Sequence, residues 1–343
     1  MAGFRRMPSI RRFSALRLLA CTLALAAPGV LPRPAAAQPA APAQAGSARS
    51  GPAAPVRIKQ LEPTTDGVEL AAWHYAAPEA APPVATVILL HDLGGSHLTV
   101  EPLAKALQAA GCTVVAPDLR GHGESRLPRP PQGDPDPAKS LKTPELLMIA
   151  SSGGGQIRDQ AGVRGDIECV RAWLKRGVAE GEIPRAPLFV VGSGLGSVLG
   201  SAWTIADARW PAGTSGPQGR EVAGLVLISP PFVAKGIQFA PLLKTEEVGR
   251  GLPILVIAGR GDRDATKVFE ALKRQRPDSW FDSRVPPGDD RAASPARPEE
   301  ATLLMFTGQA DRSGDQLAAM RAARGDPASL VLAFVKAVKA RAE

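Results

Sequence analysis

Short apolar runs recur along most of the chain, separated by segments with helical spacing. Six runs are continuous and apolar, which is typical of strands buried on both faces of a sheet. They cover residues 86–90, 113–116, 188–191, 225–228, 254–257 and 302–306. Two earlier segments, 56–61 and 68–75, flank a Thr-Asp-Gly turn and predict a short antiparallel pair.

Apolar residues between these runs are three or four positions apart, as on one face of a helix. This spacing occurs at 103–110, 163–174 and 198–203, and a last helix is predicted to begin at Asp326-Pro327. Strands that alternate with helices predict a mostly parallel, eight-stranded α/β sheet with helices on both faces. We assign it to one domain, residues 57–343.

The N-terminus has the pattern of an export signal. A positive segment, Arg5–Arg17, precedes an uncharged apolar stretch at 18–30, and Ala35-Ala36-Ala37 fits a cleavage site. The stretch is shorter than the ~20 residues that a spanning helix needs. We therefore expect a signal peptide at 1–37 and a periplasmic or secreted mature chain without a transmembrane span. Leu18-Leu19-Ala20-Cys21 resembles a lipobox, so a lipoprotein acylated at Cys21 is the alternative.

Residues 38–56 are mainly Ala, Pro, Gln, Gly and Ser, a composition that predicts a flexible tether. Two cysteines remain in the mature chain. Cys112 opens a predicted strand and Cys169 lies in a predicted helix, which favours two buried thiols. A disulfide between them stays open, because disulfides persist outside the cytosol.

Composition narrows the function classes. The chain is 44% hydrophobic, which supplies a sizeable core. Its net charge of +8 comes mostly from residues 1–37, which hold six Arg and no acid, whereas the remainder has 35 Lys and Arg against 33 acids. The basic balance therefore gives no support to nucleic-acid binding.

Three predicted strand ends carry recognisable motifs. They read His-Asp-Leu-Gly-Gly-Ser at 91–96, Asp-Leu-Arg-Gly-His-Gly-Glu-Ser at 118–125 and Gly-Ser-Gly-Leu-Gly at 192–196. With these motifs the chain resembles the α/β-hydrolase superfamily from about residue 57 to its end. The resemblance implies the α/β-hydrolase fold. Only 22 residues separate Pro230 from Pro253, so the cap is expected to be minimal.

In this superfamily a nucleophile at the centre of G-x-S-x-G is followed by an acid and then a histidine. Here the centre is Gly194, which has no side chain to attack a carbonyl and which relieves the backbone strain of the turn. Asp262 occupies the acid position, and we expect a loop carboxylate paired with Arg260 or Arg263. All four histidines precede residue 123, so no imidazole follows the acid. The triad looks degenerate.

Parts of the site remain. The backbone N–H groups of Leu93 and Leu195 are expected at the oxyanion position, where Asp92 would oppose an oxyanion if it pointed inward. His91 and His122 are assigned structural roles. A rearranged dyad of Ser193 and His97 is the catalytic alternative. The sequence predicts neither a cofactor nor a metal site.

A narrower resemblance is carried by motifs within residues 206–230 and covers most of the chain from Val68 onward: the chain is similar to a group of exported bacterial α/β-hydrolase-like proteins with a substituted nucleophile position. The hypothesis is a pseudoenzyme that binds a small molecule or a protein in the cell envelope. The alternative is a secreted serine hydrolase, of esterase, lipase or peptidase type. The Pro-rich, charged segments 127–150 and 282–300 are expected to be solvated loops, and the alternative is that they edge the cleft or bind a partner.

Overall fold

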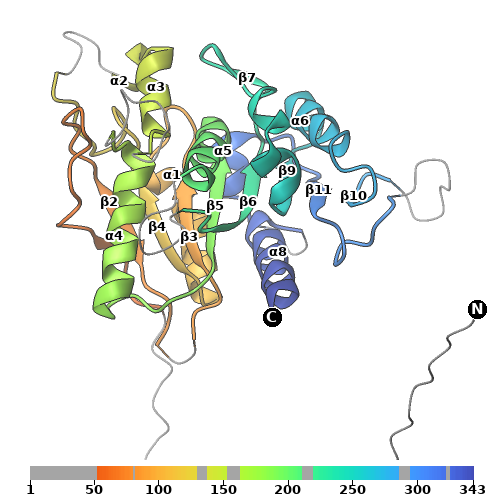
Figure 1. Cartoon of the computed structure of the whole chain (residues 1–343), viewed down its shortest axis with the longest axis horizontal. Helices are drawn as coiled ribbons and strands as arrows, with labels where there is room; N and C mark the ends of the chain where they lie inside the picture. The colour runs from red at the N-terminus through yellow and green to blue at the C-terminus, as the bar shows by residue number, and fades with distance from the viewer. Residues whose placement is uncertain are drawn as a thin grey trace, which may run out of the picture. The chain divides into compact units, whose positions relative to one another are not determined.

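A twisted sheet of nine strands forms the centre of the computed structural model (Figure 1). Its strand order is β1-β2-β4-β3-β5-β6-β9-β11-β10, and the pairs β1–β2 and β2–β4 at one end are antiparallel whereas the other pairs are parallel. The strands are β1 (Val56–Arg57), β2 (Ala72–Tyr75), β3 (Thr86–Leu90), β4 (Thr113–Pro117), β5 (Leu188–Ser193), β6 (Val222–Ile228), β9 (Ile254–Ala258), β10 (Trp280–Asp282) and β11 (Leu303–Thr307). A separate hairpin pairs β7 (Val233–Ala234) with β8 (Ile237–Gln238).

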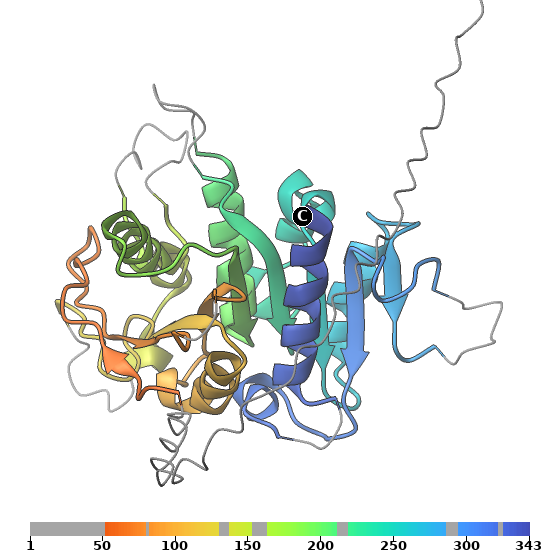
Figure 2. The ribbon, with the colours of Figure 1, turned by 90° about the horizontal axis from the view of Figure 1, so that it is seen from below.

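Helices cover both faces of the sheet, and each layer has its own apolar core (Figures 1 and 2). One layer contains α3 (Thr143–Ile149), α4 (Asp166–Glu180), α5 (Leu195–Ala208) and α6 (Arg263–Lys273). The other contains α1 (His97–Ala109), α7 (Gly314–Ala318) and α8 (Pro327–Ala342). Short segments complete the set: α2 (Pro137–Ser140), the 3₁₀ turn η1 (Leu242–Lys244) and the π-helical turn η2 (Glu247–Gly251).

The structure describes residues 52–79, 82–129, 137–152, 163–210, 219–285, 294–321 and 325–343. These residues belong to one compact unit, Arg49–Glu343. The predicted signal peptide, Cys21 and most of the predicted tether lie outside the described residues, as do parts of segments 127–150 and 282–300.

The six apolar runs all form parallel strands, because continuous apolar sequence suits a sheet covered on both faces. The sheet has one strand more than the eight we counted. The addition is β10, which pairs with β11 and whose last residue, Asp282, begins the segment that we expected to be a solvated loop. Cys112 and Cys169 are both buried and free, so the predicted buried thiols are found and the disulfide is not.

A buried ion pair joins two loops at the antiparallel end of the sheet. Arg120, in the Asp-Leu-Arg-Gly motif, is 2% exposed. Its Nε and Nη2 donate to Asp166 Oδ1 at 2.9 and 2.7 Å, and its backbone N–H donates to Asp166 Oδ2 at 2.7 Å. Its Nη1 reaches Asp66 at 2.6 Å. The motif therefore fixes the start of α4 against the strand ends.

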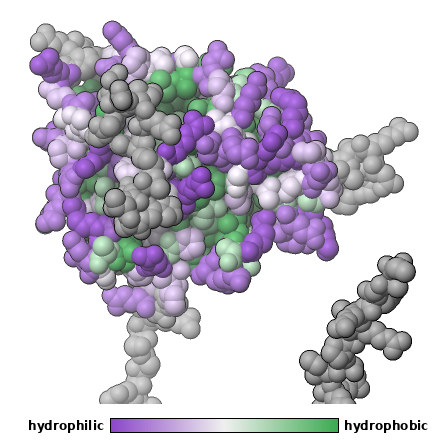
Figure 3. Space-filling model, in the orientation of Figure 1, coloured by the Kyte–Doolittle hydropathy of each residue, from purple (hydrophilic) through white to green (hydrophobic). Residues whose placement is uncertain are grey.

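Hydrophilic side chains dominate the face shown in Figure 3, with smaller apolar areas between them. Among the described residues, the large hydrophobic side chains that are exposed are Val56, Leu98, Leu147 and Val233. Within the same ranges, every helix is too short or too polar to span a bilayer.

Candidate functional site

The predicted nucleophile turn lies where the sequence placed it, between β5 and α5. Gly194 has φ 49° and ψ −120°, and its N–H donates to Ile228 O at 2.9 Å. A side chain in this backbone region costs on the order of 1–3 kcal/mol. This turn, residues 192–196, keeps the strained geometry of a nucleophile elbow, and glycine adopts that geometry without the strain energy.

The carboxylate of Asp92 occupies the space that a nucleophile's side chain would need. A Cβ built on Gly194 would lie 2.0 Å from Asp92 Cγ and 2.1 Å from each carboxylate oxygen. A Cβ on Gly314, which has φ 51°, would lie 2.4 Å from Asp92 Oδ2. Two positive-φ glycines therefore form a cradle that only the absence of side chains keeps open for Asp92.

Both predicted oxyanion donors are present, and Asp92 uses both. Its Oδ1 accepts the backbone N–H groups of Leu93 and Leu195, each at 2.7 Å. We expected an inward carboxylate to oppose an oxyanion here. It takes the oxyanion's place instead. Burial raises the pKa of Asp92 above its ordinary value, while the two N–H groups act in the opposite direction.

The start of α7, which follows the loop after β11 where a hydrolase would carry its histidine, braces Asp92. Asp315 Oδ1 accepts the backbone N–H of Asp92 at 2.8 Å, and the other Asp315 oxygen accepts the Thr99 hydroxyl of α1. Asp315 was not predicted from the sequence, because the residue expected in this part of the chain is a histidine. The available signal was an aspartate at position 92 in a chain with glycine at the elbow.

Asp262 lies at the sheet edge, as predicted, but in a different role. It caps α6, with Oδ1 accepting the N–H of Ala265 at 2.9 Å, and Oδ2 accepts the Ser229 hydroxyl. The expected pairing with Arg260 or Arg263 was wrong, since no ion pair of Asp262 occurs in the described ranges. A cap gives this carboxylate a structural function without a histidine to orient.

His91 holds the strand end, as assigned from the sequence. Its Nε2 accepts the N–H of Leu119 at 3.0 Å, which leaves Nδ1 to donate to Asp92 O at 2.6 Å. Burial and the adjacent His122, whose ring centroid is 4.9 Å away, lower the pKa of His91 to about 4. His91 is therefore neutral at pH 7, and both of its nitrogens are engaged.

Ser193 and His97 are not joined. His97 Nδ1 lies 2.9 Å from Asp118 Oδ1, and its ring stacks on Trp73 with a centroid separation of 3.3 Å. The Ser193 hydroxyl is fully buried and has no hydrogen-bond partner among the described residues. Ser197 donates to Gly192 O at 2.7 Å. Neither serine has the base contact that nucleophilic catalysis requires.

A cavity of about 330 Å³ opens above the elbow. Its lining residues come from the elbow, the strand ends and the β7–β8 hairpin, and include Asp92, Gly194, Ser229, Lys235, Asp262 and Gly314. Lys235 Nζ donates to Lys139 O at 2.6 Å, and the Thr143 hydroxyl donates to Lys235 O at 2.7 Å. The hairpin is thus tied to the 127–150 segment through Lys139 and Thr143.

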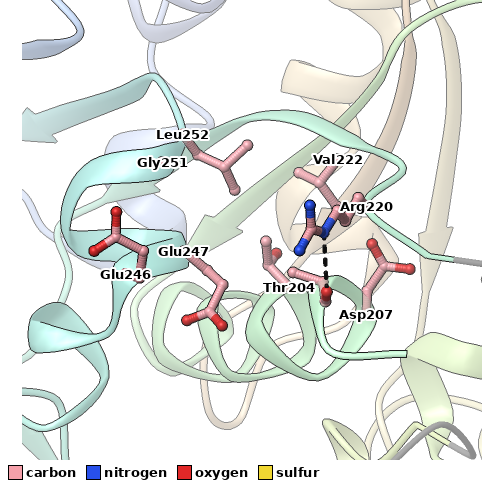
Figure 4. A pocket seen from close by; sticks show the side chains of 9 residues that line it. Thr204, Asp207, Arg220, Val222, Glu246, Glu247, Gly251 and Leu252 are labelled. Carbon is pink, nitrogen blue, oxygen red and sulfur yellow. Dashed lines mark hydrogen bonds between the residues drawn. The ribbon is translucent and has the colours of Figure 1, made fainter. Parts of the chain in front are cut away.

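No group of His, Cys, Asp and Glu side chains in the described part of the chain is arranged to hold a metal ion. Figure 4 shows a different pocket, at the opposite edge of the sheet, where α5 ends and β6 begins. Its volume is about 330 Å³, and Arg220 extends into it with Nε 3.4 Å from Ala208 O. None of the motif residues lines this pocket.

The chain is similar to several proteins of known structure. The chain is similar to an esterase of Pyrococcus furiosus (17% identity, 82% of this chain and 90% of that one covered, TM-score 0.49). It is also similar to a highly thermostable carboxyl esterase from Bacillus coagulans (12% identity, 83% and 98% covered, TM-score 0.47). A third similar structure is an alpha-beta serine hydrolase homologue from Coxiella burnetii (18% identity, 75% and 88% covered, TM-score 0.43). No curated protein matches the chain.

The model of the alpha/beta hydrolase family matches residues 87–337, which is well over half of the chain. That range begins in β3 and ends in α8, so it includes the elbow, the Asp92 loop and the loop after β11. The chain belongs to the alpha/beta hydrolase family.

Proposed function

We propose that this protein is an exported member of the family that has lost triad catalysis and serves as a binding or interaction module in the cell envelope. The observation that carries the proposal is the position of Asp92. Its carboxylate fills the nucleophile's space and accepts both oxyanion N–H groups. A substrate carbonyl would have to displace a half-buried carboxylate that accepts two backbone hydrogen bonds before either donor became free.

The chemistry of the remaining groups supports the same proposal. Catalysis by a serine hydrolase needs a nucleophile, a base that takes its proton and an oxyanion hole. Gly194 supplies no nucleophile, and the carboxylate of Asp92 fills the oxyanion hole. The base role lacks an occupant, because the imidazoles of His91 and His97 are bonded elsewhere. What remains is a cavity rimmed by polar groups, which suits a ligand or a partner's side chain.

Fluorophosphonate labelling of the purified mature chain, followed by intact mass measurement, tests the proposal. We expect no adduct and no hydrolysis of short p-nitrophenyl esters above the buffer rate, with an active serine hydrolase as the positive control. Stoichiometric labelling that disappears in Ser193→Ala or Ser197→Ala would overturn the proposal and establish the rearranged serine hydrolase instead.

Export is the second part of the proposal, and it stands on the charge and apolar pattern of residues 1–37. N-terminal sequencing of the protein recovered from outside the cytoplasm should begin at Gln38. A chain that begins at an acylated Cys21 would replace this part with a lipoprotein, and an uncut chain in the cytoplasm would contradict export.

A further inference from the structure

Another pocket, the α4 pocket, lies on the opposite edge of the sheet from the elbow, beside α4 and the starts of β3, β5 and β6. Its volume is about 340 Å³. The lining comes from α4, from the loop into β5 and from the residue before β6; the side chains that matter are Arg171, Leu174, Lys175, Val178, Arg185 and Leu188. No motif of the hydrolase family contributes to it.

One stripe of α4 forms the wall of this pocket. Arg171, Leu174, Lys175 and Val178 follow the spacing i, i+3, i+4, i+7, so they share one face of the helix. A stripe with this spacing is normally apolar throughout, because it faces the core. Here two of its four positions are cationic, and like charges at i and i+4 destabilise a helix. The stripe therefore combines an apolar surface with a charge arrangement that an anion would relieve.

The carboxylates nearby pair with two of the three cations that line the pocket. Arg171 is paired on both sides, with Glu221 (Nε 3.0 Å, Nη2 2.5 Å) and with Glu168 (Nη1 3.3 Å). Lys175 reaches the same Glu221 only at 3.4 Å, with its side chain 59% exposed. Arg185, on the loop that follows α4, makes no side-chain hydrogen bond or ion pair with any described residue. Two carboxylates, Glu168 and Glu221, thus pair with Arg171 and Lys175, and the third cation, Arg185, is unpaired among the described residues.

The apolar part of the pocket comes from Leu174, Val178 and Leu188, of which Leu174 and Leu188 are buried in the core and Val178 packs against it. The pocket of Figure 4 has the opposite balance, since three carboxylates (Asp207, Glu246 and Glu247) line it with Arg220 as the cation. Positive charge beside an apolar floor therefore distinguishes the α4 pocket.

We propose that the α4 pocket binds an amphiphilic anion, an alkyl chain that ends in a single carboxylate or phosphate. The head group lies between Lys175 and Arg185, and the chain lies over Leu174, Val178 and Leu188. The site goes beyond the proposed function of the elbow, and its occupancy does not depend on whether Gly194 is part of a catalytic centre.

Calorimetric titration of the mature protein with five probes tests the proposal. Octanoate and octyl phosphate carry both features; acetate and inorganic phosphate lack the chain, and octanol lacks the charge. We expect the two octyl anions to bind and the other three to bind much more weakly. Binding should weaken as salt is added, because the two head-group cations are exposed to screening.

The test variant is Lys175→Gln combined with Arg185→Gln, two exposed positions whose replacement should leave the melting temperature unchanged. Loss of two exposed charge contacts should weaken octanoate binding by about tenfold. The matched control is Lys105→Gln with Arg250→Gln, two exposed cations remote from the pocket, which should keep the wild-type affinity. Val178→Ser should weaken the octyl anions without changing acetate.

Three results would overturn the proposal: octanol binding as tightly as octanoate, equal octanoate affinity in the test variant and the control, or no binding of either octyl anion in the millimolar range. Each is independent of fluorophosphonate labelling, so a failure here is distinguishable from a failure of the function proposed for the elbow.

Discussion

Gly194→Ala adds one methyl group at the point where the Asp92 carboxylate lies. The new Cβ would lie 2.0 Å from Asp92 Cγ, so the carboxylate must leave its cradle. It then loses the N–H groups of Leu93 and Leu195, and hydrogen bonds to a charged acceptor contribute about 1.5–3 kcal/mol each. Backbone strain at φ 49° adds about 1–3 kcal/mol. Because release of a half-buried carboxylate to water offsets part of this sum, we expect a loss of about 3–6 kcal/mol in the free energy of unfolding.

Gly261→Ala is the matched control. Gly261 also has a positive φ, 74°, but no atom lies within 4 Å of the position its Cβ would take. Its cost should be backbone strain alone, about 1–2 kcal/mol. The sequence alone predicts only this backbone strain at Gly194. The difference in free energy of unfolding between the two variants therefore isolates the contribution of Asp92.

Equilibrium unfolding in urea measures the free energy of unfolding for each variant. The cycle is completed by Asp92→Gly and by Asp92→Gly with Gly194→Ala. Once Asp92 has lost its side chain, Gly194→Ala should cost only its strain, which gives a coupling energy of about 2–3 kcal/mol between the two positions. If Gly194→Ala costs no more than Gly261→Ala, or costs the same with and without the Asp92 side chain, the steric reasoning is refuted.

Two further predictions concern the carboxylates of Asp92 and Asp166. Burial raises the pKa of Asp92 above the ordinary 3.8, so the folded protein holds this proton more tightly than the unfolded chain. The stability of the wild type relative to Asp92→Asn should therefore fall as the pH rises above that ordinary value, measured by urea unfolding across a pH series; a rise would contradict it. Asp166→Ala should cost about 3–5 kcal/mol in the same assay, because it leaves the buried guanidinium of Arg120 with only the half-exposed Asp66. Asp66→Ala is the comparison and should cost less, and an equal cost for the two would refute the role given to burial.

Strands were predictable because their signal is local. Each of the six parallel strands that we predicted is a continuous apolar run, as expected for a strand with an apolar core on both faces. β10 was not predicted, because a strand of three residues within charged and Pro-rich sequence has no detectable periodicity. Its place in the sheet depends on pairing with β11 alone.

The site was predictable in its positions and not in its contacts. The elbow, the acid position and the two oxyanion donors follow from motif spacing along the chain. The placement of the Asp92 carboxylate depends on partners far away in sequence, 103 residues at Leu195 and 223 at Asp315. The role of Asp262 depends on the hydroxyl of Ser229, 33 residues away. Spacing indicates which residues share a sheet edge, and it does not specify the rotamers that they adopt.

The cradle around Asp92 also fixes the order in which an esterase could evolve from this chain. A nucleophile installed first at position 194 collides with the carboxylate, and so does any side chain installed first at position 314, beside the elbow. This is sign epistasis, because each new side chain destabilises the protein until Asp92 is replaced by a smaller residue. Directed evolution that begins from Asp92→Gly should therefore accumulate substitutions at positions 194 and 314, whereas libraries that retain Asp92 should leave both glycines unchanged.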